Sequence, residues 1–298
     1  MRIRYGIPVL AVAAALALGL SGCVDNSTPT TSGGGTTPSG SKDAAAVALL
    51  PANIKSSGKI QVGVDATYPP NESKDSSGAA IGWDIDLFNA VSAKLGVKAV
   101  YNIAGFDTII PSITGGKYDV GVSSFTDTTE REKKVDFVNY YSAGILWASQ
   151  KGKTVDPDNA CGLKVAVETG TTEELDDVPG KSKACTDAGK AAIQILKFDG
   201  QDQATNAVIL GQADAMSADS PITDDAIAKS SGKLQAAGKS FGIAPYGVAV
   251  NKGSKLADAL QKAFQAIVDD GQYKTILDKW GVADGSLATI TINAASKG

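Results

Sequence analysis

Short runs in which apolar and polar residues alternate are followed along this chain by longer runs whose apolar residues recur at helical spacing. The first alternating run, residues 60–64, predicts a strand. The next run, residues 84–95, predicts a helix, because its apolar side chains share one face and Gly96 follows as a stop signal. The residues on that face are Leu87, Phe88, Val91 and Leu95.

This alternation continues to the end of the chain. Further strands are predicted over residues 97–103, 119–123, 163–167, 193–198 and 213–217. Further helices are predicted over residues 106–114, 204–210 and 256–268, after Pro221, and in a short segment that ends near Trp280. Strands that alternate with helices favour an α/β fold whose sheets are mostly parallel and whose connections are right-handed crossovers.

The first residues have the features of an export signal. Arg2 and Arg4 precede an apolar stretch, residues 7–20, that is too short to span a membrane comfortably. The stretch ends in Leu-Ser-Gly-Cys, which resembles the lipobox of bacterial lipoproteins, where the cysteine is acylated and becomes the mature N-terminus. We therefore expect residues 1–22 to be a lipoprotein signal peptide and Cys23 to carry lipid, palmitate included. An ordinary secretory signal and an uncleaved membrane anchor are the alternatives.

The segment that follows differs in composition from the rest of the chain. Residues 24–43 are mostly Ser, Thr, Gly, Pro, Asn and Asp, which cannot bury enough apolar surface to fold. We predict that residues 23–43 form a disordered tether. Such a tether holds a folded domain near a membrane while letting it reorient.

Composition excludes several classes of function. The chain has 298 residues, 43% of them hydrophobic, which suffices for one large or two modest domains. Its formal net charge is -4 and it has no long basic run, so we expect no nucleic-acid partner. The chain has no histidine, which removes most of the usual zinc and non-haem iron ligand sets. We expect neither a metal nor a cofactor.

The three cysteines are expected to have two different roles. With Cys23 assigned to the lipid, Cys161 and Cys185 remain as a pair in an oxidising compartment, which predicts a disulfide. A redox role is the weaker alternative, because the two are far apart in sequence and lack the close spacing of dithiol motifs.

Several motifs in one order resemble a known family. They are residues 63–70 (GVDATYPP), 82–87 (GWDIDL), 106–137, 170–172 (GTT), 214–219 and 270–280. Between residues 60 and 281 the chain is similar to the extracellular solute-binding proteins of polar amino-acid ABC importers, family 3. The resemblance implies a two-lobed, type II periplasmic-binding-protein-like α/β fold, each lobe a mostly parallel sheet flanked by helices.

The same resemblance implies how the chain divides. Lobe 1 is expected to contain residues 44–142 and 246–298, and lobe 2 residues 143–245. Two hinge strands would join the lobes near residues 141–144 and 241–246. The ligand would be enclosed between the lobes.

A zwitterionic ligand needs partners for both of its charges when it leaves water. Arg131 resembles the family's carboxylate-binding arginine, and a guanidinium can bind both carboxylate oxygens at once. Taken alone, Arg131 lies in a charged segment that also fits a solvated helix start. Thr171 and Thr172 would add backbone amides at a helix start, although they also fit a plain N-cap.

The α-ammonium group needs oxygen acceptors, and the resemblance implies Ser124 and Thr126 on one lobe and Asp219 on the other. Ser123 belongs to the same motif and is assigned to the site with them. Without the family, Asp219 before Ser220-Pro221 is more typical of a helix cap.

Aromatic residues are expected to wall the pocket. Tyr68 and Phe106 match wall positions, although either also fits an ordinary core. Trp83 stands where the family usually has Phe, which predicts a bulkier pocket floor, and Asn71 replaces another expected Phe.

Acidic residues bear on the ligand's side chain. Asp65, Asp84 and Glu173 lie at or near positions that could face it, and an acidic pocket favours a cation. We therefore favour arginine, lysine or histidine as ligand, while glutamine or another neutral polar amino acid fits nearly as well. Asp65 and Asp84 also fit a purely structural role.

These inferences predict a monomeric, lipid-anchored protein outside the cell. It would bind a polar amino acid, close its lobes around it and deliver it to the membrane subunits of an ABC importer. A sensor of amino acids is an alternative, since it needs the same closure. An enzyme on this fold, with Glu173 as acid or base, is another, but the sequence offers no nucleophile–base pair.

Overall fold

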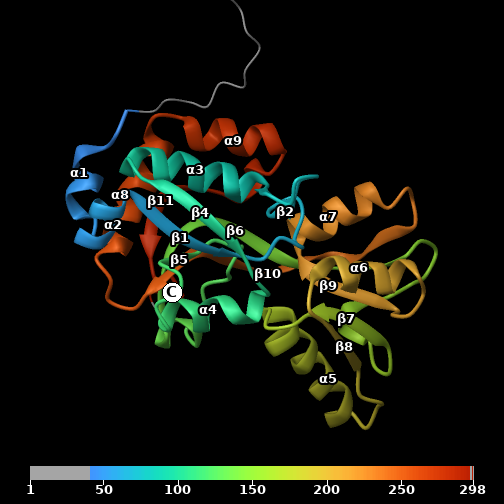
Figure 1. The fold of residues 1–298 in the computed structure, drawn as a ribbon. Coiled ribbons are helices and arrows are strands. Elements are labelled where there is room, and N and C mark those ends of the chain that lie inside the picture. The colour runs from blue at the N-terminus through green and yellow to red at the C-terminus, as the bar shows by residue number, and fades with distance from the viewer. Residues whose placement is uncertain (1–40, 296, 298) are drawn as a thin grey trace, which may run out of the picture. The chain divides into compact units, whose positions relative to one another are not determined.

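The computed structural model describes residues 41–295 and Lys297. Nine strands of this described chain form one sheet (Figure 1). These strands are β1 (Lys59–Val64), β4 (Lys98–Ile103), β5 (Val120–Gly121), β6 (Val135–Gln150), β7 (Lys164–Glu168), β8 (Gln194–Phe198), β9 (Ala215–Asp219), β10 (Leu234–Asn251) and β11 (Ser286–Ile292). Two short strands, β2 (Ser73–Lys74) and β3 (Ala80–Ile81), form a separate hairpin.

Helices flank this sheet. The α-helices are α1 (Ala44–Leu49), α2 (Ala52–Ser57), α3 (Trp83–Leu95), α4 (Phe106–Thr114), α5 (Val178–Asp187), α6 (Gln201–Ile209), α7 (Ser220–Lys229), α8 (Leu256–Asp269) and α9 (Gln272–Trp280). Short 3-10 turns cover Arg131–Lys133, Pro157–Asn159 and Ala283–Gly285, and a π-helical turn covers Glu173–Asp177. Within the described residues, no helix combines the length and the apolar character that a membrane crossing requires.

The strand order places two parallel groups on either side of an antiparallel pair. The order is β4-β1-β5-β10-β6-β9-β7-β8, with β11 paired to β6. Strands β4, β1 and β5 are parallel, as are β8, β7 and β9, whereas β10 and β6 run antiparallel to each other and to their neighbours. This is the two-lobed α/β fold predicted from the sequence, with β6 and β10 belonging to both halves.

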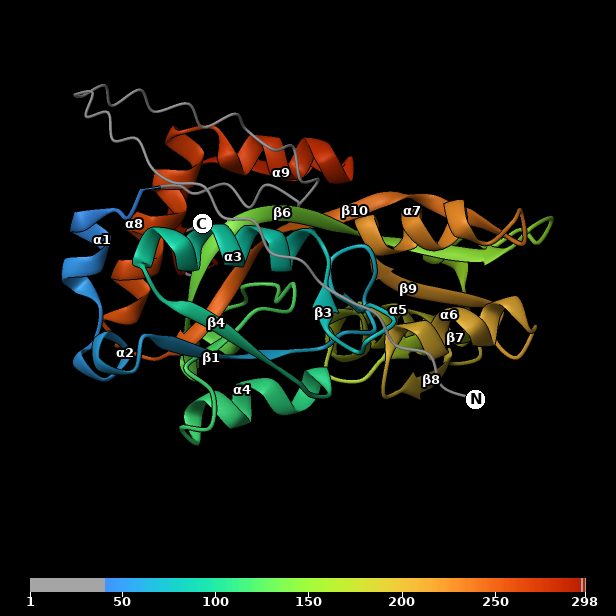
Figure 2. The same cartoon turned by 45° about the horizontal axis from the view of Figure 1, so that its top comes forward.

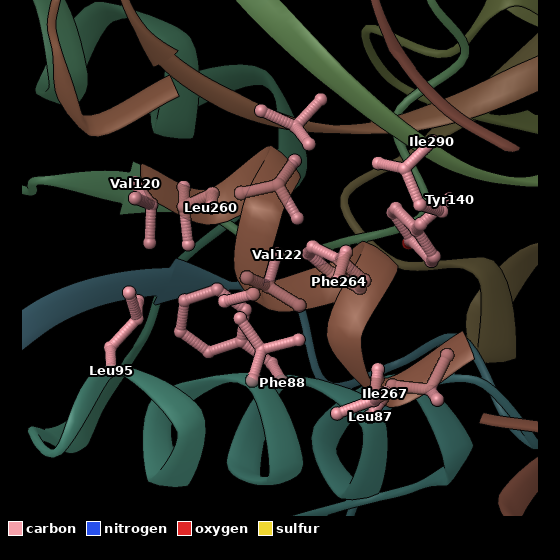
Figure 3. Packing of buried hydrophobic residues seen from close by; sticks show 14 of the residues in the cluster. Leu87, Phe88, Leu95, Val120, Val122, Tyr140, Leu260, Phe264, Ile267 and Ile290 are labelled. Atoms are coloured by element: carbon pink, nitrogen blue, oxygen red, sulfur yellow. The ribbon is translucent and has the colours of Figure 1, made fainter. Parts of the chain in front are cut away.

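Each half has its own helices and its own core. In both views α1, α3, α8 and α9 lie with β1 and β4, while α5, α6 and α7 lie with β7, β8 and β9 (Figures 1 and 2). The largest apolar cluster draws on residues 46–143 and 246–292, and two further clusters draw on residues 145–241. Figure 3 shows the first of these, in which Leu87 and Phe88 of α3 pack with Phe264 and Ile267 of α8.

Local sequence accounts for the ends of α3, which begins beside the site described below. Gly82 precedes the helix at φ 141°, and a Cβ there would lie 1.8 Å from the carbonyl oxygen of Asn71, so only glycine fits. Gly96 ends the helix in the left-handed conformation at φ 67°, as the sequence predicted.

Most predicted elements are confirmed, and the exceptions are local. The strand predicted over residues 119–123 is only β5, two residues long, because the chain turns away at Ser123 and Ser124. Helix α6 begins at Gln201, ahead of the predicted start. The sequence pattern does not predict α1, α2 or β11, which pack against α8, β1 and β6 respectively.

The predicted disulfide is confirmed. Cys161 and Cys185 are bonded, with their Cα atoms 5.5 Å apart, and they tie the segment before β7 to α5. The bond closes a loop of 24 residues, which contributes about 3 kcal/mol on the chain-entropy estimate. The predicted signal peptide, Cys23 and nearly all of the predicted tether lie outside the described residues.

Candidate functional site

One cavity gathers the residues that the sequence assigned to a ligand. Its lining consists of Asp65, Tyr68, Phe106, Ser123, Ser124, Thr126, Arg131, Glu168, Thr171, Thr172, Glu173 and Asp219. All the residues predicted to contact a ligand line this cavity except Trp83, and Glu168 is an addition that the sequence analysis missed.

The sheet explains why these residues meet. Asp65 follows β1, Ser123 follows β5, Glu168 ends β7 and Asp219 ends β9. Each lies at the carboxyl end of a strand in one of the two parallel groups, which is where open α/β sheets place their ligands. The two groups contribute to the cavity from opposite sides of β6 and β10.

Arg131 presents its guanidinium to the cavity. Its Nη1 donates to the carbonyl oxygen of Thr126 at 2.7 Å, and its Nη2 donates to that of Gly170 at 2.9 Å. The guanidinium carbon lies 5.4 Å from the ring centre of Phe106 and 5.7 Å from that of Phe125. Burial lowers the pKa of Arg131, but an arginine remains charged at neutral pH. Within residues 41–295 this cation forms no ion pair.

Asp219 faces Arg131 from the other half of the sheet. Its Oδ2 accepts a hydrogen bond from the Tyr68 hydroxyl at 2.9 Å, and its backbone N–H donates to the same hydroxyl at 3.2 Å. It occupies the N-cap position of α7, yet its side chain makes no capping hydrogen bond. Burial raises the pKa of Asp219 to about 6, although Tyr246, Tyr68 and Arg131 oppose the shift.

Glu173 begins the π-helical turn that precedes α5. Its Oε2 accepts from the Thr172 hydroxyl at 3.2 Å, while Oε1 is buried and receives no N–H or hydroxyl donor from the described residues. Burial, and then the charge of Asp219, raise the pKa of Glu173 to about 8. Glu173 is therefore mainly a neutral acid at pH 7.

Thr171 and Glu174 form part of a capping box. Glu174 donates its backbone N–H to the Thr171 hydroxyl at 3.3 Å, but its carboxylate accepts from the backbone N–H of Gly170 instead of that of Thr171. The Thr171 hydroxyl in turn donates to the Glu168 carbonyl oxygen at 2.7 Å. These bonds fix the turn that carries Thr171 and Thr172 to the cavity.

Trp83 does not line the cavity, which differs from its predicted place on the pocket floor. It is fully buried in the core, with its ring centre 4.7 Å from that of Tyr141. Its Nε1 donates to Asn71 Oδ1 at 2.6 Å, and Asn71 Nδ2 donates to the Ser124 hydroxyl at 2.8 Å. The two departures from the family pattern thus contact each other, and together they support Ser124 from behind.

Two further acids lie behind Ser124. The Ser124 hydroxyl donates to Glu72 Oε1 at 2.8 Å, and the Tyr140 hydroxyl donates to Asp84 Oδ2 at 2.8 Å. Burial raises the pKa of both carboxyl groups, and the charge of Asp84 raises that of Glu72 further. Asp84 is therefore a core residue, which agrees with the structural alternative stated for it.

Asp65 and Glu168 lie on either side of Thr67. The Thr67 hydroxyl donates to Asp65 Oδ1 at 2.6 Å and lies 3.4 Å from Glu168 Oε1. The backbone N–H of Asp65 donates to the Ser123 hydroxyl at 2.9 Å. Glu168 could have been found in the sequence, because it is the polar residue that ends an alternating apolar strand just before Gly170-Thr171-Thr172.

A cavity between the two halves of such a sheet, with one unpaired guanidinium and several carboxyl groups, defines a two-lobed binding protein for a small charged solute. The chain belongs to the bacterial extracellular solute-binding proteins, family 3, whose family model matches residues 60–283.

Individual relatives agree with this assignment. The chain is 38% identical over 248 residues to the arginine-binding protein ArgT of Corynebacterium glutamicum, covering 83% of this chain and 82% of that protein. It resembles the solved structure of an ancestral arginine-binding protein bound to arginine, with a TM-score of 0.69, 35% identity, and coverage of 75% of this chain and 98% of that one.

A further solved structure bears on enzymatic alternatives. It is an ancestral amino acid-binding protein described as a precursor of cyclohexadienyl dehydratase. The TM-score is 0.65 at 33% identity, covering 76% of this chain and 97% of that chain. All three of these similar proteins are named as binding proteins.

Proposed function

We propose that this protein binds a cationic α-amino acid outside the cell, with L-arginine as the first candidate, and delivers it to an ABC importer. One observation carries the proposal: a single cavity is lined both by the Arg131 guanidinium, which forms no ion pair among the described residues, and by the Asp219 carboxyl group. An α-amino acid offers one anion and one cation at short separation, and it would give each of these groups a partner.

The proposed roles follow from donors and acceptors. Arg131 binds the α-carboxylate, with help from backbone amides at Thr171 and Thr172. Asp219 binds the α-ammonium group, with Ser123, Ser124 and Thr126 as oxygen acceptors on the opposite side. Tyr68 and Phe106 form apolar walls that exclude water. Trp83 has no ligand contact in this proposal.

Closure is proposed to occur about β6 and β10. Hydrogen bonds from Arg131 to Gly170 and from Tyr68 to Asp219 join the two halves. The pairing of β10 with β6 shifts register between Ala237 and Phe241, between Phe241 and Ala244, and between Tyr246 and Gly247. Such irregularities weaken a ladder locally. They support hinges near residues 141–144 and 241–246, and so the lobes 44–142 with 246–298 and 143–245.

The lining of the cavity supports a cationic ligand. Four acids, Asp65, Glu168, Glu173 and Asp219, line it against a single arginine, and a bound cation would favour their ionised forms. Relatives named as arginine-binding proteins support the same choice. The side chain of the neutral alternative, glutamine, would bring these acids no positive charge.

A binding screen tests the proposal. The chain from Val24 onward would be melted with each of the twenty amino acids, because a ligand that binds only the folded state raises Tm. The expected result is a large rise with arginine, a smaller one with lysine or histidine, and none with glutamate. A rise with glutamine alone would replace the cationic proposal by the neutral one, and no rise at all would refute amino-acid binding.

A separate test distinguishes a binding protein from an enzyme. Burial brings the pKa values of two cavity acids, Glu173 and Asp219, near neutrality, and the hydroxyl that hydrogen-bonds to Glu173 is that of Thr172. We propose that the ligand leaves unchanged. Overnight incubation with arginine followed by mass spectrometry should recover only arginine, whereas a new product would support the enzymatic alternative.

Attachment and assembly complete the proposal. We propose that Cys23 carries lipid, that the protein is a monomer held at the outer face of the membrane, and that it uses no cofactor. Cys23→Ala should shift the protein from the membrane fraction to the soluble fraction and abolish labelling by radioactive palmitate. Unchanged fractionation would refute the anchor.

A further inference from the structure

Glu168 is a buried carboxyl group that the roles above do not use. It ends β7, only 1% of its surface is exposed, and it lines the cavity. Its carboxyl group receives one hydrogen bond from the described residues, that of the Thr67 hydroxyl to Oε1 at 3.4 Å. A carboxylate buried to this degree ordinarily has strong donors or a cation beside it.

The Thr67 hydroxyl is only a weak donor to Glu168. A hydroxyl has one hydrogen, and the Thr67 oxygen lies 2.6 Å from Asp65 Oδ1, so the hydrogen is given mainly to Asp65. The same oxygen accepts from the backbone N–H of Gln201 at 3.2 Å. Glu168 and Asp65 therefore face each other across one hydroxyl with a single proton between them.

No cation of the described chain offsets these two acids. Neither Asp65 nor Glu168 has an ion pair with a lysine or arginine among residues 41–295. The groups whose charge most raises the pKa of Glu168 are all acids, namely Asp65, Glu173 and Asp202. The groups with the largest charge effect on Arg131 are Glu173, Asp219, Asp176 and Tyr68, so Asp65 and Glu168 interact with this cation more weakly. The cavity thus has an arginine end and an acidic end.

We propose that Glu168 determines the specificity of this site, by binding together with Asp65 the cationic end of the ligand's side chain. The inference rests on the proposed function, in which Arg131 and Asp219 hold the α-groups. A planar guanidinium has donors on two edges, which suits two carboxylates from opposite halves of the sheet. Burial raises the pKa of Glu168 well above its usual range, and the charge of Asp65 adds to this. A bound cation would reverse that shift.

The test compares L-arginine with L-citrulline by isothermal titration calorimetry. Citrulline has nearly the shape of arginine, but a neutral urea group replaces the guanidinium. Wild type should prefer arginine strongly. Glu168→Gln keeps the side-chain shape and removes the charge, so it should weaken arginine binding by roughly 10- to 100-fold while changing citrulline binding by less than about 3-fold.

Asp202→Asn is the matched control. Asp202 is exposed and does not line the cavity, but its charge raises the pKa of Glu168. It should leave the arginine-to-citrulline ratio unchanged, which separates a direct contact from a general field. Asp65→Asn is a second variant, and it should lower the same ratio as Glu168→Gln does.

The outcomes separate the two proposals. Wild type that binds neither arginine nor any other amino acid contradicts the proposed function. Wild type that prefers arginine, with Glu168→Gln retaining the full preference, overturns the role of Glu168 alone. Equal weakening of arginine and citrulline in Glu168→Gln would also overturn it, since that result assigns the residue a structural role.

Discussion

Two pairs of buried carboxyl groups differ in their place, since one pair hydrogen-bonds to Ser124 from the core and the other lines the cavity. The core pair is Glu72 and Asp84, and the cavity pair is Glu173 and Asp219. Burial raises the pKa of all four, and within each pair the two groups interact closely enough to share a proton. Judged by burial and titration alone, the two pairs are alike.

Their surroundings differ. The core pair receives hydrogen bonds from Ser124 and Tyr140, and no arginine of the described part of the chain pairs with it. The cavity pair lies beside Arg131, whose guanidinium has no ion pair within the described chain. A perturbed pKa therefore does not identify a functional acid by itself. The neighbouring cation and the open cavity distinguish the acids that await a ligand from those that hold the fold.

Arg131→Ala would remove the feature that most separates the two pairs. We expect arginine binding to weaken by at least about 3 kcal/mol, more than 100-fold in Kd, because a buried charge partner of the ligand is lost. Folding should be retained, since Arg131 fills no apolar core. Calorimetry measures the first effect and thermal melting the second.

Lys133→Ala is the control, because Lys133 is an exposed cation in the same turn and, among the described residues, pairs only with Glu130. It should bind arginine as wild type does. Near-normal binding by Arg131→Ala would show that another group holds the ligand's carboxylate and would remove the contrast between the pairs.

Asp219→Asn should have the next largest effect. The amide keeps the shape and can still accept from Tyr68, but it offers the ligand's ammonium group no charge. We expect a loss of about 2 kcal/mol, roughly 30-fold in Kd, in a soluble and folded protein. Asp224→Asn, an exposed change in the same helix, is the control. Unchanged affinity in Asp219→Asn would assign the ammonium group to another acceptor.

The sequence predicted the fold well where local pattern and packing agree. The alternating residues of β1 and β7 and the apolar face of α3 each point to the observed element, with Gly82 and Gly96 at its ends. The long strands β6 and β10 could be inferred only from the family resemblance, because their outer halves pack against different cores.

The site was predicted less completely, and two residues show why. Glu168 resembles any polar residue at a strand end until β1 and β7 are placed on opposite sides of one cavity. Trp83 was placed in the pocket because its position usually carries Phe. Its larger ring and its N–H, which Asn71 accepts, instead place it in the core. The positions of Glu168 and Trp83 depend on contacts that the local sequence pattern does not contain, so the pattern alone could not predict them.

Glu72→Gln tests the core pair through stability. The folded pKa of Glu72 lies well above its unfolded value near 4.5. Above pH 4.5 the folded state therefore keeps a proton that the unfolded state has lost. The free energy of unfolding of wild type should therefore fall as pH increases above about 4.5. Glutamine does not titrate, so the variant should lose less stability over the same rise in pH.

Melting curves across this pH range measure the difference. Glu130→Gln is the control, since Glu130 is exposed and its pKa is lowered by Lys133, and it should leave the pH slope of the chain almost unchanged. An identical slope in wild type and Glu72→Gln would mean that the core pair holds no extra proton. Arginine binding should be nearly unaffected, because Glu72 does not line the cavity.

Glu173→Gln makes the same change in the cavity pair and should have the smallest effect. The pKa of Glu173 rises from 4.5 to about 8, chiefly by burial and by Asp219, while Asp177 adds to the shift. Because the folded pKa is again the higher one, ligand-free wild type loses stability as pH rises from about 4.5 to 8. The variant should therefore melt on the order of 4 °C higher than wild type at pH 8.

Added arginine then separates the two pairs. A ligand ammonium beside Asp219 favours ionised carboxyl groups, so it should reduce the pH slope that Glu173 contributes and bring wild type and Glu173→Gln closer together. The slope contributed by the core pair should persist, because the ligand does not reach Glu72 or Asp84. If arginine altered the slope of Glu173→Gln as much as that of wild type, the two pairs would have to be regarded as one titrating unit coupled through Ser124.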